Sequence, residues 1–364
     1  MPMLVATEAR PAGDRLRPHP RQRGVHLPLK VAGAELRDAI EKALEGLPTA
    51  KVKAEDWERT RYSPTPTIVE AARALYAGHD VKDIVRHDAA GEHLRQTHAY
   101  LLDLAERMRA AGGKAICFVT GVPGAGKTLV GMNLATAKLA PAGSEEVNCV
   151  YLSGNGPLVD VLREALARDS VAREQQRGRR LRKNDARAKV KSFIQNIHHF
   201  RDEYLKDRLN PPADRVVVFD EAQRSWNLQQ TRNFLKRRRK IGSFDMSEPE
   251  FLLSCMDRHE DWAAVVCLVG EGQEINTGEA GIKEWLESLN RSFPHWQVHV
   301  APQLRGGEYG AAAALEKAAA AGRVHYSERL HLSASVRSFR AEKLSEFVNA
   351  LLDREAAAAR GLLA

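Results

Sequence analysis

The chain has 364 residues, of which 43% are hydrophobic, 28% charged and 6% aromatic, and this excludes a disordered chain and a small secreted scaffold. Its formal net charge of +8 favours polyanionic partners. No apolar run approaches the roughly 20 residues of a membrane span and the first ten residues lack the apolar core of a signal peptide, so we expect a cytoplasmic protein without a membrane partner.

The first third of the chain is predicted to precede the main domain. Residues 1–34 contain Arg, Pro and His without an apolar period, which indicates a flexible basic arm. Residues 35–112 are predicted to form an N-terminal helical region. Apolar spacing, with Gly and Pro at the breaks, places its helices at 35–47, 67–77 and 91–110.

Residues 113–303 show a different pattern, in which short apolar runs alternate with helical spacing. Such runs are typical of strands buried on both faces, so we expect an α/β domain with a mostly parallel sheet flanked by helices. The predicted strands are residues 115–119, 149–152, 216–219, 263–269 and 297–300. A helical C-terminal extension is expected over residues 304–364, with a short strand near 330–333 and helices at 311–321 and 340–352.

A glycine-rich loop between the first predicted strand and a helix matches the P-loop motif G-x-x-x-x-G-K-[ST]. The glycines let successive backbone N–H groups face phosphate oxygens, Lys127 places a positive charge on the β and γ phosphates, and the Thr128 hydroxyl is a ligand for Mg²⁺. The absence of an N-K-x-D guanine signature favours ATP as the nucleotide. The residues predicted to bind it are Gly121, Val122, Pro123, Gly124, Ala125, Gly126, Lys127, Thr128 and Leu129.

Two carboxylates follow the predicted strand at 216–219, which we expect to neighbour the P-loop strand. Asp220 is predicted to hold Mg²⁺ through its water shell, as a Walker B carboxylate does. Glu221 is predicted to act as the base for the attacking water or to position it.

Three further segments carry candidate site residues. Gln273 follows the strand at 263–269, where an uncharged amide can report γ-phosphate occupancy through a hydrogen bond. Arg337, with Arg340 in reserve, is the candidate for stabilising charge in phosphoryl transfer, although a surface arginine would look the same. The segment 151–159, which places small polar groups at the end of the second predicted strand, either contacts a nucleic-acid backbone or only turns the chain.

Basic residues gather at two places where phosphates are expected to dock. Residues 173–191 contain nine Lys or Arg against two acids, and a second cluster occupies residues 236–240. His198 and His199 are expected to be packed or solvated and not to bind metal. The four cysteines show no C-x-x-C pair, so buried reduced thiols are expected at Cys117, Cys149, Cys255 and Cys267.

Together these motifs resemble the Schlafen group 3-type DNA/RNA helicase domain, over roughly residues 57–352. The likeness rests on the P-loop, on 152–158, on Asp220-Glu-Ala-Gln-Arg224 with Trp226, on 270–281 with Trp285, and on 335–340. It implies a RecA-like P-loop ATPase that binds single-stranded DNA or RNA. It also implies helicase motif I, II, III and IV roles for Lys127, Thr128, Asp220, Glu221, Gln273 and Arg337.

The helicase pattern includes a second lobe, which would need on the order of 100 or more residues, whereas about 60 follow the last predicted core strand. We therefore expect one motor lobe, a second lobe supplied by a protein partner or absent, and no autonomous unwinding. An ATP-controlled protein-binding switch with little turnover is the alternative, in which ATP-dependent partner capture survives Glu221→Gln. A kinase is disfavoured, because the pair of carboxylates at 220 and 221 favours water over a hydroxyl acceptor.

Overall fold

A computed structural model describes residues 3–6, 17, 20, 27–44, 67–78, 88–137, 148–239, 244–270, 279–306, 310–333, 347, 350, 351 and 354–362. Spatial contacts divide the chain into two compact units, Met1–Tyr62 and Ser63–Ala364.

The first unit contains a strand pair and a helix. β1 (Met3–Ala6) pairs in parallel with β2 (Leu29–Ala32), which continues through the 3-10 turn η1 (Gly33–Glu35) into α1 (Leu36–Leu44). The prediction of a flexible arm over residues 1–34 is therefore wrong at both strands. Each strand is four residues long, too short to show a period within a segment rich in Arg and Pro. The small core of this unit consists of Leu29, Val31 and Ala39.

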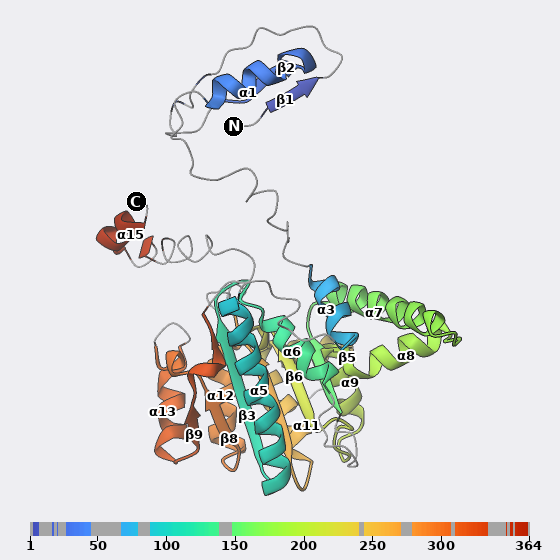
Figure 1. Ribbon diagram of the computed structural model, residues 1–364. Coiled ribbons are helices and arrows are strands. Elements are labelled where there is room, and N and C mark those ends of the chain that lie inside the picture. Colours follow the sequence, from blue (N-terminus) through green and yellow to red (C-terminus); the bar gives the residue numbers. More distant parts are fainter. Residues whose placement is uncertain are drawn as a thin grey trace. The chain divides into compact units, whose positions relative to one another are not determined.

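The second unit is built on an eight-stranded sheet in the order β5-β4-β6-β7-β3-β8-β9, with β10 also paired to β3 (Figure 1). All its strand pairs are parallel, so the predicted α/β class with a RecA-like parallel sheet is confirmed. The strands are β3 (Lys114–Gly121), β4 (Cys149–Ser153), β5 (Ile194–Asn196), β6 (Val216–Asp220), β7 (Ala263–Leu268), β8 (Gln297–Val300), β9 (Val324–Tyr326) and β10 (His331–Leu332).

Helices cover both faces of this sheet, because its strands alternate their buried side chains between two apolar clusters. The helices packed on one face are α3 (Ile68–Tyr76), α5 (Asp88–Ala111), α6 (Lys127–Thr136), α7 (Gly156–Gln176) and α8 (Lys183–Phe193). Those on the other face are α9 (Ile197–Lys206), α11 (Glu248–Asp257), α12 (Gly281–Ser292) and α13 (Ala312–Ala320). The shorter elements are η2 (Ala222–Arg224), α10 (Leu228–Phe234), the π-helical η3 (Leu235–Arg239), η4 (Pro302–Arg305), η6 (Glu328–Leu330) and α15 (Ala356–Leu362).

The expected domain borders differ from the observed packing. Helices α3 and α5 fall within the stretch predicted as a separate helical region, but they lie against the sheet and share its core. Strands β9 and β10 extend the sheet beyond residue 303, into the segment expected to be a helical extension. The helix predicted at 340–352 lies largely outside the described residues.

The four cysteines are buried free thiols, three of them in β3, β4 and β7 and one in α11, as predicted. Within the described part of the chain, no helix is both long enough and apolar enough to cross a membrane.

Candidate active site

The carboxyl ends of three parallel strands bring the P-loop, Asp220 and Ser153 to one edge of the sheet. The P-loop follows β3, Asp220 ends β6, and Ser153 ends β4. The expectation that the strand ending in Asp220 neighbours the P-loop strand is wrong, since β7 lies between β6 and β3. Order within a sheet is a long-range property, and strand-forming runs alone do not determine it.

The P-loop has the backbone shape that its glycines allow. Gly124 and Gly126 adopt φ of +78° and +91°, values that other residues rarely take, and α6 begins directly after Gly126. Lys127 donates from Nζ to the carbonyl oxygens of Gly121 at 2.6 Å and Val122 at 3.1 Å. Its charge is therefore held over the start of the loop.

Strand β10 fixes the start of the P-loop. The N–H of Val122 donates to the carbonyl oxygen of Leu332 at 3.1 Å, and Leu332 is the parallel partner of Gly121. A Cβ at Gly121 would lie 2.5 Å from that oxygen, and φ is +156° there, so only glycine fits. The sequence predicts a strand near Leu332 but not this partner.

Asp220 is a buried carboxylate, with 8% of the residue exposed. Burial, and to a lesser degree the neighbouring Glu221, raises its pKa to about 6, although nearby Tyr151, Ser153 and Lys127 act in the opposite direction. The Ser153 hydroxyl donates to Asp220 Oδ2 at 3.4 Å. A nearby cation would stabilise the charged form of this buried carboxylate.

Tyr151 lies beside the candidate site, a position that its place in the sequence does not indicate. Its ring is fully buried, and its hydroxyl lies beside both Asp220 and Thr128 but makes no hydrogen bond of good geometry among the described residues. Burial, reinforced by the Asp220 charge, raises the Tyr151 pKa well above its usual value, so the hydroxyl keeps its proton. The hydroxyl and carboxylate oxygens of Thr128 and Asp220 are the ligands that Mg²⁺ prefers, and they fit a hydrated Mg²⁺.

Glu221 is one of two non-glycine residues described with positive φ, at φ +53° and ψ +46°. Left-handed backbone at such a residue typically costs about 1–3 kcal/mol and persists where neighbouring contacts enforce it. Gln223 Nε2 donates to Glu221 Oε2 at 2.6 Å, and Arg224 Nε lies 3.6 Å from the same oxygen. The carboxylate is thus oriented by two side chains from the next turn.

Gln273 lies outside the described residues, but the described residues on either side of 271–278 contact the loop that follows Asp220. Before this stretch, the N–H of Gly270 donates to Gln223 Oε1 at 3.3 Å. After it, the N–H of Ala280 donates to the carbonyl oxygen of Ser225 at 2.7 Å.

Arg337 and Arg340 also lie outside the described residues.

Residues 114–363 match the family profile described as "Schlafen group 3, DNA/RNA helicase domain". The chain belongs to this family. The Schlafen group 3 assignment covers the whole parallel sheet and agrees with a helicase-like NTPase fold. A search of curated proteins found no match. The solved structure described as "Structure of Drosophila ORC bound to DNA" aligns with 91% of this chain and 73% of that chain at 16% identity, with a TM-score of 0.25. That score is too low to show a common fold.

In this Schlafen group 3 domain, His198 packs against Trp226, as expected of a packed and not metal-binding histidine. Its ring lies 5.2 Å from that of Trp226, and burial, followed by the nearby Arg201, lowers its pKa to about 4. His199 is exposed. Among the described residues, no group of three or more His, Cys, Asp or Glu could hold a metal ion.

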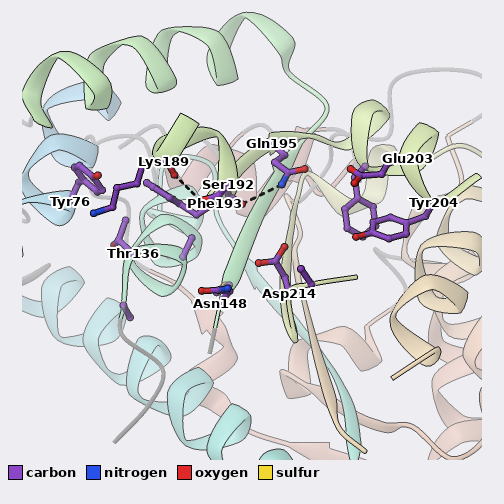
Figure 2. A pocket seen from close by; sticks show the side chains of 15 residues that line it. Tyr76, Thr136, Asn148, Lys189, Ser192, Phe193, Gln195, Glu203, Tyr204 and Asp214 are labelled. Carbon is purple, nitrogen blue, oxygen red and sulfur yellow. Dashed lines mark hydrogen bonds between the residues drawn. The ribbon is translucent and has the colours of Figure 1, made fainter. Parts of the chain in front are cut away.

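A second hollow lies at the opposite edge of the sheet, where β4 and β6 begin (Figure 2). Its volume is about 560 Å³, and Asn148, Tyr204 and Asp214 contribute to its walls. Burial, and then the nearby Glu203, raises the pKa of Asp214 to about 6. Because the P-loop is at the other edge, this hollow is separate from the candidate active site.

Proposed function

We propose that this chain binds Mg-ATP at the P-loop and hydrolyses it while bound to the backbone of single-stranded DNA or RNA. One observation carries the proposal. The P-loop, a buried carboxylate at Asp220 and an oriented carboxylate at Glu221 meet at the carboxyl edge of one parallel sheet.

Nucleotide binding would use groups that are already in place. The loop N–H groups and the amino end of α6 face the phosphates, and Lys127 exchanges the carbonyl oxygens of Gly121 and Val122 for phosphate oxygens. Thr128 and Asp220 would hold Mg²⁺, which neutralises charge on the β and γ phosphates.

Hydrolysis would use water as the acceptor. Glu221 takes a proton from the attacking water, and the oxygen of that water bonds to the γ-phosphorus. At the same time the bond between the γ-phosphorus and the bridging oxygen breaks, and ADP leaves. The predicted contact of Gln273 with the γ-phosphate is supported by the two described hydrogen bonds that flank residues 271–278. Arg337 is proposed to stabilise the charge that develops on the transferred group.

Nucleic-acid binding is supported by a basic hairpin formed by α7 and α8 (Figure 1). Ion pairs from Lys183 and Arg187 of α8 to Glu164 of α7 join the two helices. Together with Arg168 of α7, these cations hold the pKa of Glu164 down at about 2. Other cations of the hairpin remain exposed and make no ion pair with any described residue. These are Arg180, Arg182, Lys189 and Lys191. Free exposed cations on a fixed frame suit phosphate contacts.

Beside this hairpin lies a hollow of about 570 Å³ whose lining includes Arg173, Arg177, Arg179 and Lys189. The Arg173 guanidinium lies 4.9 Å from the centre of the Tyr76 ring, and both side chains line this hollow. In the second cluster, Lys236 and Arg237 are exposed, and the side chains at 238–240 lie outside those described.

The first test is ATP hydrolysis by wild type, Lys127→Ala and the exposed control Lys317→Ala, each with and without single-stranded DNA and RNA. We expect stimulation by nucleic acid in wild type and control. In Lys127→Ala we expect ATP affinity to fall roughly 10- to 100-fold, because a charged hydrogen bond to phosphate is lost. Equal rates in all three proteins, or no hydrolysis in wild type, would contradict the proposal.

The second test is a band-shift titration with a double variant, Arg180→Ala with Arg182→Ala, and with Lys317→Ala as the control. Binding should weaken, and its logarithmic salt dependence should become shallower by about 0.7 for each lost contact to single-stranded phosphate. Unchanged affinity and salt dependence would remove the hairpin from the nucleic-acid surface. No shift by wild type at low salt would overturn the nucleic-acid part of the proposal.

A further inference from the structure

The Gln223 side chain uses both ends of its amide within the candidate active site. Its Nε2 donates to Glu221 Oε2 at 2.6 Å, and its Oε1 accepts from the N–H of Gly270 at 3.3 Å. Only 1% of the residue is exposed, so water does not compete for these bonds. A carboxylate in place of the amide could not donate to Glu221, and an apolar side chain could make neither bond.

The hydrogen bond from Gln223 Nε2 orients the Glu221 carboxylate, which needs contacts with other side chains to keep one orientation. Glu221 sits in left-handed backbone, and 39% of its side chain is exposed, so solvent would let it rotate. Arg224 Nε lies 3.6 Å from Glu221 Oε2, and the Arg224 side chain is 46% exposed, so this ion pair constrains the carboxylate only weakly. The short bond from a buried amide is therefore the main constraint on where the Glu221 oxygens point.

The second bond connects that carboxylate to the next strand. Gly270 follows β7, the strand between β6 and the P-loop strand β3, and segment 271–278 begins directly after it. A shift of the backbone at Gly270 would therefore be transmitted to the Glu221 carboxylate through the Gln223 side chain.

We infer that Gln223 is a positioning residue, which holds Glu221 toward the attacking water and links its placement to the end of β7. The inference rests on the proposed ATP hydrolysis and extends it to a residue outside the P-loop and the two carboxylates. Gln223 acts through Glu221 and touches neither nucleotide nor metal in this scheme.

The loop around Gln223 keeps its shape by other bonds, which separates positioning from folding. The indole N–H of Trp285 donates to the carbonyl oxygen of Ala222 at 2.9 Å, and the N–H of Trp226 donates to Glu248 Oε2 at 2.9 Å. The bond from Ala280 to Ser225 is backbone to backbone. Loss of the Gln223 amide should therefore leave the loop folded.

The experiment compares Gln223→Met, which keeps length and apolar volume, with Gln223→Glu, which keeps an acceptor for Gly270. The control is Gln229→Met, at an exposed glutamine of α10. For Gln223→Met we expect kcat to fall about 10- to 100-fold with little change in KM or in the affinity for a fluorescent ATP analogue. For Gln223→Glu we expect the acidic limb of the pH–rate profile to move to higher pH, because two adjacent carboxylates then share a proton.

A double-mutant cycle with Glu221→Gln decides whether Gln223 acts through Glu221. In the Glu221→Gln background, Gln223→Met should cause less than about a twofold further loss of kcat. Multiplicative losses, or an unchanged kcat in Gln223→Met, would overturn the inference while leaving the ATPase proposal intact. If wild type binds ATP but does not hydrolyse it, the proposed function and the inference fail together. If Lys127→Ala binds ATP as tightly as wild type does, the proposed nucleotide site itself is wrong.

Discussion

Replacing Asp220 by Asn should make the nucleotide-free protein more stable. The folded protein holds the Asp220 pKa near 6 instead of the ordinary 3.8, chiefly through burial, so folding disfavours its charged form. That difference corresponds to about 3 kcal/mol of free energy of unfolding. Asparagine retains an oxygen that can accept from Ser153 and carries no charge.

The sign of the effect follows from which state binds the proton more tightly. Below about pH 4 Asp220 is neutral in both states and carries no penalty, and between pH 4 and 6 the unfolded chain loses its proton first. Above pH 6 the folded state bears the full penalty. The advantage of Asp220→Asn should thus be about 1 kcal/mol at pH 4.5 and rise to about 3 kcal/mol at pH 8.

Urea unfolding followed by tryptophan fluorescence, in EDTA at pH 4.5 and 8, measures this difference. Asp103→Asn is the matched control, because its ion pair with Arg107 is exposed and should change stability by less than about 1 kcal/mol. Saturating Mg-ATP, at about 100 times its dissociation constant, should add about 2.7 kcal/mol to wild type and clearly less to Asp220→Asn. A loss of stability in Asp220→Asn at pH 8, or a gain that is equal at both pH values, would refute this reasoning.

Two further substitutions test contacts around the site. Gly121→Ala should lower both the melting temperature and the affinity for ATP, because the new Cβ would lie 2.5 Å from the carbonyl oxygen of Leu332. Gly178→Ala is the control, since a Cβ there meets no neighbouring atom and adds only the backbone strain of φ +72°, about 1 kcal/mol. Equal melting temperatures for the two variants would show that the contact with Leu332 does not constrain the loop. Arg201→Met should lower the free energy of unfolding by about 3–5 kcal/mol, since it leaves Glu248 buried without its partner at 2.9 Å. Chemical denaturation checks this, and adding Glu248→Gln should recover most of the loss; no recovery would rule out the uncompensated charge as the cause.

Local patterns predicted the central strands and the P-loop. The runs that became β3, β4, β6, β7 and β8 are continuous and apolar because both faces of those strands are covered. The P-loop was recognised since its chemistry lies in one contiguous stretch, from Gly121 to Thr128.

Features that depend on distant residues were not predicted. Strands β5 and β9 have three residues each, too few to show a pattern, and pairing to longer neighbours stabilises them. The roles of Tyr151 and Gln223 were missed for a related reason. Tyr151 approaches Asp220 from another strand, which no local spacing indicates. Gln223 lies within the Asp220-Glu-Ala-Gln-Arg224 motif, but its second partner, Gly270, is 47 residues away, so the motif alone does not show the link.

The bond between Val122 and Leu332 also has a consequence for protein synthesis. The ribosome makes the two partners roughly 210 residues apart, which at 5–20 residues per second is a delay of about 10–40 s. During that interval a nascent chain carries the glycine-rich loop without the carbonyl that sets its first turn. The first turn of the loop can therefore take its folded form only after β10 has been made.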